Sequence, residues 1–578
     1  MININFNIYN IPFSRYGAYV ALTGDKSKKQ LTVHNARRRC GEDETFEAEI
    51  LENGNLCNYE LSASPDAVTV KCDTGEVKIY VRDDNTLVFV STGPDLRFTL
   101  KSNFGYGVDQ GDGQYEMISV QHHLYTRLFV KQGSGLLEGP FYDGHDFKWN
   151  NTPVDIKKTL YVKCESGTSI VALQMTPDET IRVDGDIDPE RDITAIRTEW
   201  NDFFAALPPI PDTVPDVERE YAAITWYNMW SSFARAEDVY AKDTMLMSKK
   251  YMSSVWSWDH CFNALAVASI SKERALDQFM APFHLQLESG SLPDMWNPHQ
   301  EVIRGVTKPP IHGWCFDKLM DRFDFTDEEL QKVYHHLEKW TLWWMEYRDS
   351  DKDGIPEYPM GCDSGWDNST VFDMGYFVES PDLSAFLVLQ MRTLSRIAGQ
   401  IRNGQDIYWS ERADGLLQKL YGHLWVGEHF IAKKSGSHEY QENPTSLLVH
   451  IPIVLGALLD YEKAEKIAHN LKNDHLTEHG LATEQVNSPR YQPDGYWRGP
   501  IWAPPTYLVV DGLRRAGFKE LAREIAEKYI KMSCHVAQGN YENFDAVTGA
   551  GLRAPGYTWS ASVYMLLFWE YRCDKVLA

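Results

Sequence analysis

The 578-residue chain contains no run of about 18 apolar residues, the length needed to cross a membrane, so the sequence predicts no transmembrane helix. Its first 20 residues, MININFNIYNIPFSRYGAYV, contain neither a basic segment nor a continuous apolar core of the kind that marks an export signal. We therefore expect a soluble, cytoplasmic protein.

Positive charge is scarce. The chain has 57 Lys and Arg against 82 Asp and Glu, which gives a formal net charge of −25. That charge repels nucleic acid and anionic membrane surfaces at long range, so neither is an expected partner. It is compatible with a neutral or small ligand, and nothing in the sequence indicates an oligomeric state.

Cysteines are few and follow no pattern. There are nine, scattered between Cys40 and Cys573, and none forms a CxxC pair. An odd number without paired spacing indicates reduced, buried thiols in the cytosol. No cysteine-based zinc site is expected.

The first 200 residues alternate apolar and polar side chains with a period of two. In the stretch AVTVKCDTGEVKIYV, Val68 and Val70 alternate with polar neighbours, and Val77 and Ile79 do the same after a turn. This pattern predicts an antiparallel β-sandwich over residues 1–204. Similar short strands are expected at 17–23, 29–37, 45–52, 118–131 and 159–175.

The pattern changes after the segment AALPPIPDTVPD, whose four prolines cannot continue a helix or a central strand. We place a linker at 205–215 and a helical domain at 216–578, which makes a multidomain chain of α and β parts. Twelve helices predict six helical hairpins in a ring, an (α/α)6 toroid, with a shorter irregular bundle as the alternative. The expected helices are 216–236, 259–270, 272–288, 312–323, 326–348, 381–402, 406–424, 444–458, 460–472, 502–516, 518–533 and 559–572.

Many of the 18 tryptophans follow the linker. Those at 340, 343 and 344 share one expected helix and are typical of core packing. Others lie in or beside polar loops rich in Gly and Pro, where a flat indole suits stacking on a sugar ring or closing a pocket. This loop set is Trp256, Trp258, Trp296, Trp366, Trp497, Trp502 and Trp559.

Two loops place an aspartate beside these indoles. In VWSWDHCFNALA, Asp259 either caps the following helix or accepts hydrogen bonds from sugar hydroxyls. In GCDSGWDNST, Asp367 directly follows Trp366. An indole desolvates a neighbouring carboxyl and favours its protonated form, as a general acid at neutral pH requires.

Two further loops add to this set. In PDGYWRGPIWAPP, Arg498 stands between two glycine turns and beside Trp497 and Trp502, which suits the wall of a sugar subsite. In GNYENFDAVTGAG, Glu542 lies among Tyr541, Asn543 and Phe544. A glutamate in a loop is commonly solvated and without a function, but these neighbours are costly to expose to water.

Two carboxyls on separate aromatic loops match the requirements of glycoside hydrolysis. One protonates the departing oxygen and the other activates water. Each role contributes about two to four powers of ten in rate.

The motifs WSWDHCF, GVTKPPIHGW, DSGWDNS, GYWRGPIW and YENFDAVTG, followed by YTWSAS, occur in this order. Together they resemble the (α/α)6 catalytic domain of glycoside hydrolase family 63 and its bacterial mannosylglycerate-hydrolase-like relatives, over about residues 215–578. The resemblance implies an inverting α-glycosidase that needs no cofactor and acts on a small oligosaccharide or glycoside, either an α-glucoside or an α-mannoside.

By the same resemblance, Asp367 is the general acid and Glu542 the general base. The reacting sugar ring is then expected to meet Trp256, Asp259, Tyr496, Trp497 and Trp502. Two departures concern the neighbouring subsite, and with it the aglycone: relatives often have Glu where Asp363 stands, and Pro-Arg where this chain has Thr370 and Val371.

The loop RDSDKDGIPEY carries Asp349, Asp351, Asp353 and Gly354 at positions 1, 3, 5 and 6 of a calcium-binding loop. Position 12 is Met360, so the usual bidentate glutamate is missing. A structural calcium site at the three aspartates and a tight connector without metal are both compatible with this sequence.

Other functions stay open at this point. A trehalase-like enzyme or a disaccharide phosphorylase on the same fold is an alternative, although a phosphorylase needs a basic phosphate pocket in place of a second carboxylate. A non-catalytic sugar-binding protein that has kept the aromatic cleft is another.

Overall fold

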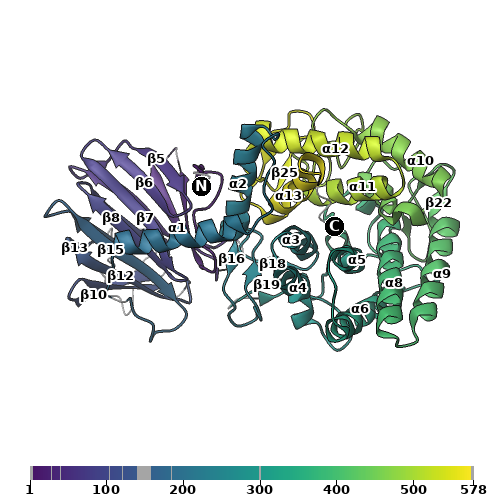
Figure 1. The fold of residues 1–578 in the computed structure, drawn as a ribbon, viewed down its shortest axis with the longest axis horizontal. Coiled ribbons are helices and arrows are strands. Elements are labelled where there is room, and N and C mark those ends of the chain that lie inside the picture. The colour runs from purple at the N-terminus through teal and green to yellow at the C-terminus, as the bar shows by residue number, and fades with distance from the viewer. Residues whose placement is uncertain are drawn as a thin grey trace, which may run out of the picture.

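A computed structural model describes residues 4–574 except 26, 28, 39–40, 103–104, 120, 139–157, 184 and 299–300. Cys40, and residue 120 within the expected strand segment 118–131, lie outside this set. Figure 1 shows a pair of β-sheets on the left and a ring of helices on the right, side by side along the long axis of the molecule.

Within the described residues, the β-domain contains two antiparallel sheets of seven and eight strands. The alternation seen in the sequence points Val68, Val70, Val77 and Ile79 into the core. Phe89 of one sheet meets Phe98 of the other edge-on at 4.9 Å, as sandwich packing requires. The first sheet contains, in order, β1 (Val20–Asp25), β2 (Gln30–Asn35), β3 (Glu44–Glu52), β9 (Asp95–Leu100), β14 (Thr159–Lys163) and β13 (Ser134–Glu138), with β4 (Asn55–Leu56) beside β3. The second contains β10 (Gly105–Gly111), β11 (Gln114–Ser119), β12 (Tyr125–Gln132), β15 (Ser169–Thr176), β8 (Thr86–Thr92), β7 (Gly75–Asp83), β6 (Ala67–Cys72) and β5 (Glu60–Ser64).

A helix that the sequence analysis did not expect, α1 (Pro189–Ala205), follows the sheets. Asp188 caps it by accepting the Arg191 N–H at 3.1 Å, and a proline occupies the first helical position. Trp200 on its buried face packs edge-on against Trp230 of the next helix at 5.4 Å. Helix α1 therefore connects the sheets to the ring, and the chain then runs through 206–215 into α2 (Asp216–Ser231).

Six helices contact one another in a closed inner ring, and six others pack around it (Figure 1). All twelve expected helical segments are present, so the predicted (α/α)6 toroid is confirmed. The inner helices, in order around the ring, are α3 (Asp259–Val267), α5 (His312–Arg322), α8 (Pro381–Ile401), η3 (Leu447–Leu458), α11 (Ala503–Arg515) and α13 (Thr558–Arg572). The outer helices are α2, α4 (Lys272–Met280), α6 (Asp327–Tyr347), α9 (Asp406–Leu424), α10 (Tyr461–Asn470) and α12 (Lys519–Lys531).

One inner element departs from the expected α-helix. η3 forms 3₁₀ turns because Pro452 lacks the N–H that an α-helix needs and Gly456 has a φ of 59°. None of the helices in the described ranges has the length and apolar character needed to cross a membrane.

Short elements occupy the loops between the helices. The strands are β16 (Phe233–Ala234), β17 (Thr244–Met245), β18 (Val255–Trp256), β19 (Met295–Asn297), β20 (Glu301–Val302), β21 (Val378–Glu379), β22 (Trp425–Val426), β23 (His429–Phe430), β24 (Lys433–Lys434), β25 (Asn543–Phe544) and β26 (Gly551–Leu552). The short helices are η1 (Ala281–Leu285), α7 (Gly361–Ser364), η2 (Thr370–Met374), η4 (Leu471–His475) and η5 (Met532–Ala537).

A buried carboxylate, Asp511 of α11, ties two inner helices together. It accepts hydrogen bonds from Trp314 at 2.9 Å and Lys318 at 2.5 Å, both on α5, and pairs with Arg515 at 2.9 Å. Burial alone would raise the pKa of Asp511, but Lys318 and Arg515 outweigh it and hold that pKa well below its ordinary value.

We predict that Asp511→Ala destabilises the ring by about 3–5 kcal/mol, because it leaves the buried Lys318 ammonium without its carboxylate. Asp321→Ala is the control: Asp321 is 61% exposed and pairs with Arg396, so its loss costs less than about 1 kcal/mol. Urea unfolding of both variants measures the difference. Equal costs would contradict the role assigned to Asp511.

Candidate active site

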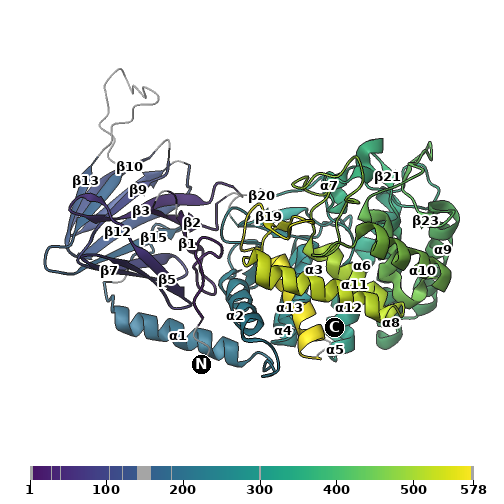
Figure 2. The ribbon, with the colours of Figure 1, turned by 90° about the horizontal axis from the view of Figure 1, so that it is seen from above.

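Loops that carry the predicted site residues gather at one end of the ring. The sheet β18–β19–β20 brings Trp256 beside Met295. Figure 2 places β19, β20 and α7 at this same end, and α7 leads directly to Asp367. The loop before α11 and the hairpin β25–β26 complete the group, since Ile501 pairs with Phe544.

The β-domain holds one of these loops. Asp43 accepts the backbone N–H of Tyr251 at 2.8 Å and contacts His34 Nδ1 at 2.8 Å. Asn297 of β19 donates to the Ala36 carbonyl at 2.9 Å. The segment that leads to Trp256 is therefore anchored outside the ring.

Asn368 fastens two of the site loops together. Its amide donates to the Gly495 carbonyl at 3.0 Å and accepts the Trp497 N–H at 2.9 Å. Arg498 donates to the Asn368 carbonyl at 2.7 Å and forms an ion pair with Asp373. The contacts of Arg498, which the sequence analysis placed in a sugar subsite, are thus with protein groups that lock the loop.

Asp367 and Glu542 both interact with the hydroxyl of Tyr496. The Glu542 side chain is largely buried, and burial raises its pKa to about 7. Arg553 and the Tyr557 side chain oppose that rise, whereas the charge of Asp367 adds to it. The two carboxyls are therefore coupled, although their loops are far apart in the chain.

A cavity of about 630 Å³ opens at Glu542, a size that suits a small ligand. Asp367 is 32% exposed and therefore reaches solvent as well. Residues that line the cavity include Lys250, Tyr251, Tyr496, Glu542, Arg553 and Tyr557.

Asp259 is 2% exposed, and neither of its carboxylate oxygens has a hydrogen-bond partner in the protein. Trp258 occupies the cap position of α3 and the Asp259 side chain makes no cap hydrogen bond, so the capping interpretation is wrong. Burial raises the pKa of Asp259 well above its usual range. A buried carboxyl without donors is suited to receive them from a ligand.

Lys308 is a site residue that the sequence analysis missed, although it lies in the quoted motif GVTKPPIHGW. Its ammonium pairs with Asp294 at 3.0 Å, approaches Asp367 to 3.8 Å and donates to the Cys362 carbonyl at 2.7 Å. Burial alone would lower the pKa of Lys308, but Asp294 and Asp367 raise it. A charged lysine therefore faces the proposed acid.

The expected tryptophans form a packed chain of rings beneath the site. Trp366 contacts Trp497 at 4.7 Å, Trp497 stacks on Trp502 at 3.9 Å, and Trp502 meets Trp559 edge-on at 5.3 Å. All four are below 10% exposed, whereas Trp256 is only partly buried. The four rings thus expose little stacking surface, but the indole N–H groups of Trp497 and Trp559 have no acceptor in the protein.

Solved structures share this architecture. A bacterial glucoamylase complexed with acarbose aligns with a TM-score of 0.62 at 12% identity, covering 98% of this chain and 94% of its own. A GH63 mannosylglycerate hydrolase from Thermus thermophilus in complex with Tris aligns with a TM-score of 0.51 at 20% identity, covering 61% of this chain and all of its own. These matches support the helical-toroid fold.

Residues 252–560 match the family described as mannosylglycerate hydrolase MGH1-like glycoside hydrolase domain, and the chain belongs to this family. It is a glycoside hydrolase, as the sequence predicted.

The mannosylglycerate hydrolase of Thermus thermophilus is 24% identical over 399 residues, 54% of this chain and 93% of the relative. The glucosylglycerate hydrolase of Mycolicibacterium hassiacum is 21% identical over 415 residues, 54% and 91% of the two chains. A periplasmic trehalase of Xanthomonas campestris is 26% identical over 181 residues, 29% of this chain and 31% of the trehalase.

We predict that Asn368→Ala lowers kcat/KM at least about tenfold, because the loop that carries Asp367 loses the two hydrogen bonds of its clamp, each worth about 1 kcal/mol or more. Asn403→Ala is the matched control, since Asn403 is exposed in a turn, where it accepts the Gln405 N–H. Asn368→Asp keeps the acceptor and should recover part of the activity. An Asn368→Ala enzyme as active as the control would refute the clamp.

The raised pKa of Glu542 predicts a pH-dependent stability. A carboxyl whose folded pKa is about 7, against an ordinary 4.5, favours the folded state fully below pH 4.5 and loses that contribution as pH rises through 7. Glu542→Gln removes the ionisation, so its stability relative to the parent should increase by about 3 kcal/mol between pH 4.5 and 8.

Thermal and urea unfolding across this pH range measure the change. Glu411→Gln, at an exposed position on α9, is the control and should show no such trend. A pH-independent difference between Glu542→Gln and the parent would contradict the buried, hard-to-ionise state of Glu542.

Proposed function

We propose that the protein is an inverting α-glycoside hydrolase with Asp367 as general acid and Glu542 as general base. The observation that carries this proposal is that Glu542 and Tyr496 line one cavity and that Tyr496 interacts with both Glu542 and Asp367. Nothing in a structural loop requires two coupled acids at that place, whereas glycoside hydrolysis does.

In the proposed reaction, Asp367 gives its proton to the glycosidic oxygen as the bond from that oxygen to the anomeric carbon breaks. Water attacks the same carbon from the opposite face and gives a proton to Glu542, which inverts the configuration. Lys308, 3.8 Å from Asp367, stabilises the carboxylate that remains. These steps require no cofactor.

Burial, with a smaller contribution from the nearby Asp367, raises the pKa of Glu542 to about 7, a value that suits a base that must accept a proton near neutral pH. Tyr496 touches both groups and offers a route by which the proton returns to Asp367 after each turnover.

The sugar ring is proposed to bind over the indole chain. Asp259 accepts hydrogen bonds from its hydroxyls, and the free N–H groups of Trp497 and Trp559 donate to them. Trp256, the most accessible of these rings, provides the stacking surface. Each such contact contributes about 1–3 kcal/mol to the choice of sugar.

The substrate we favour is a small α-mannoside or α-glucoside whose aglycone is a small acid such as glycerate. The family and the names of the relatives support this choice, and so do Lys250 and Arg553 on the cavity wall, because their charges complement a carboxylate. A neutral disaccharide of the trehalose type is the second candidate, favoured by the local similarity to trehalases.

The mechanism is tested by NMR of the first product anomer during hydrolysis of mannosylglycerate, glucosylglycerate and trehalose, with and without phosphate. The β-anomer should appear first from the α-linked substrate, and phosphate should not enter the product. An α-anomer would overturn inversion, and a sugar phosphate would establish a phosphorylase instead.

Substitutions separate the two roles. Asp367→Asn and Glu542→Gln should each lose about 10²–10⁴-fold in kcat on the natural glycoside. A glycosyl fluoride releases its fluoride ion without needing a proton from the enzyme. With this substrate, Asp367→Asn should regain most of its rate while Glu542→Gln stays inactive. Asp474→Asn, at an exposed site, serves as the control and keeps full activity.

The reverse pattern with the fluoride would exchange the assigned roles. Variants as active as the parent would refute the assignment of the pair. If the parent itself were inert while sugars still raised its Tm, the protein would be a sugar-binding protein without catalysis.

A further inference from the structure

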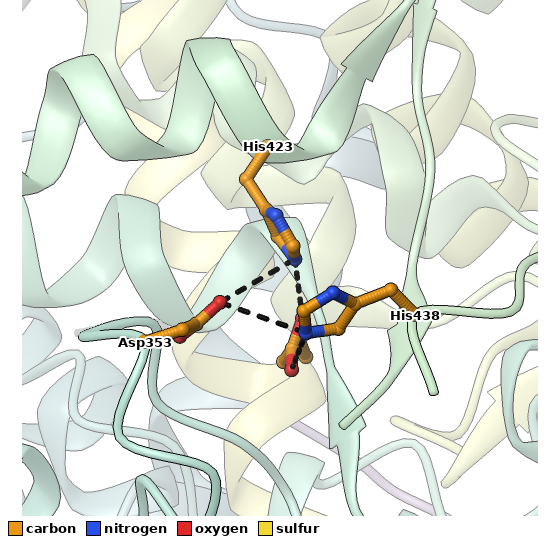
Figure 3. A group of neighbouring side chains, drawn as sticks. Asp353, His423 and His438 are labelled. Atoms are coloured by element: carbon orange, nitrogen blue, oxygen red, sulfur yellow. Dashed lines mark hydrogen bonds and ion pairs between the residues drawn. The ribbon is translucent and has the colours of Figure 1, made fainter. Parts of the chain in front are cut away.

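Four potential metal-ligand side chains from four separate segments converge beside the helical ring. Asp353 lies in the loop after α6, Glu379 ends β21, His423 lies in the last turn of α9, and His438 follows β24. Figure 3 shows Asp353, His423 and His438 directed toward a common point. One ligand atom from each of the four residues lies within 4.8 Å of those of the others.

The separations approach those of a tetrahedral site. His438 Nε2 lies 3.7 Å from Glu379 Oε1 and 3.8 Å from Asp353 Oδ2, and His423 Nε2 lies 3.7 Å from Asp353 Oδ2. Ligand atoms bound at about 2.0–2.1 Å to a tetrahedral Zn²⁺ stand about 3.3–3.4 Å apart. His423 Nε2 and Glu379 Oε2, at 2.6 Å, are closer, and they would move apart around an ion.

Glu379 provides an independent indication of a ligand. Its side chain is 0% exposed, and Oε1 has no hydrogen-bond partner. A buried carboxylate oxygen without a donor is costly, and a cation at this position removes that cost. Asp353 is already oriented for such a cation, because Oδ1 accepts the Ile355 N–H at 2.7 Å and Oδ2 faces both imidazoles.

We propose that Asp353, Glu379, His423 and His438 bind one divalent transition-metal ion, with Zn²⁺ as the best fit. Two imidazole nitrogens and two carboxylate oxygens match the ligands of tetrahedral zinc, whereas calcium takes oxygen ligands almost exclusively. Each histidine would coordinate through Nε2. Asp351, which contacts His438 Nε2 at 3.0 Å, would keep its hydrogen bond from Gly436 at 2.8 Å.

This site overlaps the calcium loop expected from the sequence. The side chains of Asp349, Asp351 and Asp353 also lie close together, and Asp353 belongs to both groups. Asp349 Oδ2 is used by the Gly354 N–H at 3.1 Å, while its Oδ1 stays without a partner. The two candidate sites therefore share Asp353, so a transition metal and calcium would compete for it. The two histidines favour the transition metal.

The metal would hold segments of the fold together and would take no part in the proposed catalytic steps. The loop from 349 to 358 is held to β21 by reciprocal hydrogen bonds between Tyr358 and Val378 at 2.9 and 2.8 Å. That loop leads into α7 and then Asp367. An ion at Asp353 would fix it to α9 and to the segment that carries His438.

The test begins with full-length protein stripped by a chelator and dialysed against metal-free buffer. Zn²⁺, Co²⁺ or Ca²⁺ is then added, and bound metal is counted by elemental analysis. We expect one Zn²⁺ per chain and a Tm increase of about 2–4 °C at roughly 100 times its Kd. Co²⁺ should give the visible absorption of a tetrahedral site, which a calcium site cannot give.

His423→Ala and His438→Ala should abolish both the Tm increase and the Co²⁺ absorption. His335→Ala, at an exposed position on α6, is the matched control and should keep both, as should Asp349→Asn. Far-UV circular dichroism without metal establishes that the variants fold. If His423→Ala does not fold, His438→Ala carries the test, because the His438 side chain is 39% exposed.

Three outcomes would overturn the proposal. Stabilisation by Ca²⁺ alone, lost in Asp349→Asn, would establish the calcium loop instead. Zn²⁺ binding that survives both histidine substitutions would place the metal elsewhere. If neither ion bound, the contact between His423 and Glu379 would be an ordinary buried ion pair.

Discussion

The catalytic end of the ring depends on carboxyl groups that are buried without being fully paired with positive charges. Asp259 and Glu542 are both largely buried, and burial raises the pKa of each. Such groups persist only where the surrounding structure prevents them from turning outward. In the neighbouring loops, the amide of Asn368 fixes the Asp367 loop to the Trp497 loop, and Trp497 stacks on Trp502. The site is therefore held by hydrogen bonds and flat rings packed beneath it, and the exposed charge of the chain contributes little to its shape.

Much of the fold could be predicted because periodicity is a local property. All twelve expected helical segments are present, and the period-two pattern indicated the sheets. The exceptions have local causes. Pro452 and Gly456 turned an expected α-helix into 3₁₀ turns, and α1 was overlooked although Asp188 and Pro189 form a clear start signal.

The site was less accessible from sequence because it depends on contacts between distant segments. The loops of Asp367 and Glu542 could be identified from their neighbours in the sequence, but the burial of their side chains could not be predicted. Sequence suggested that Trp502 presents a stacking face, whereas its ring is wholly buried. Lys308 gave no signal because its role arises only where it meets Asp294 and Asp367. The same applies to His423 and His438, which are far from Asp353 in the chain and close to it in space.

Asp43 belongs to the β-sandwich, yet its carboxylate holds the backbone of Tyr251, which lines the cavity. Burial alone would raise the pKa of Asp43, but His34 and the Tyr251 N–H keep it low, so this anchor is a charged and durable one. Part of the pocket rim is thus supplied by a neighbour outside the toroid. A ring without its sandwich would lack the carboxylate that fixes Tyr251, and with it one fixed edge of the cavity.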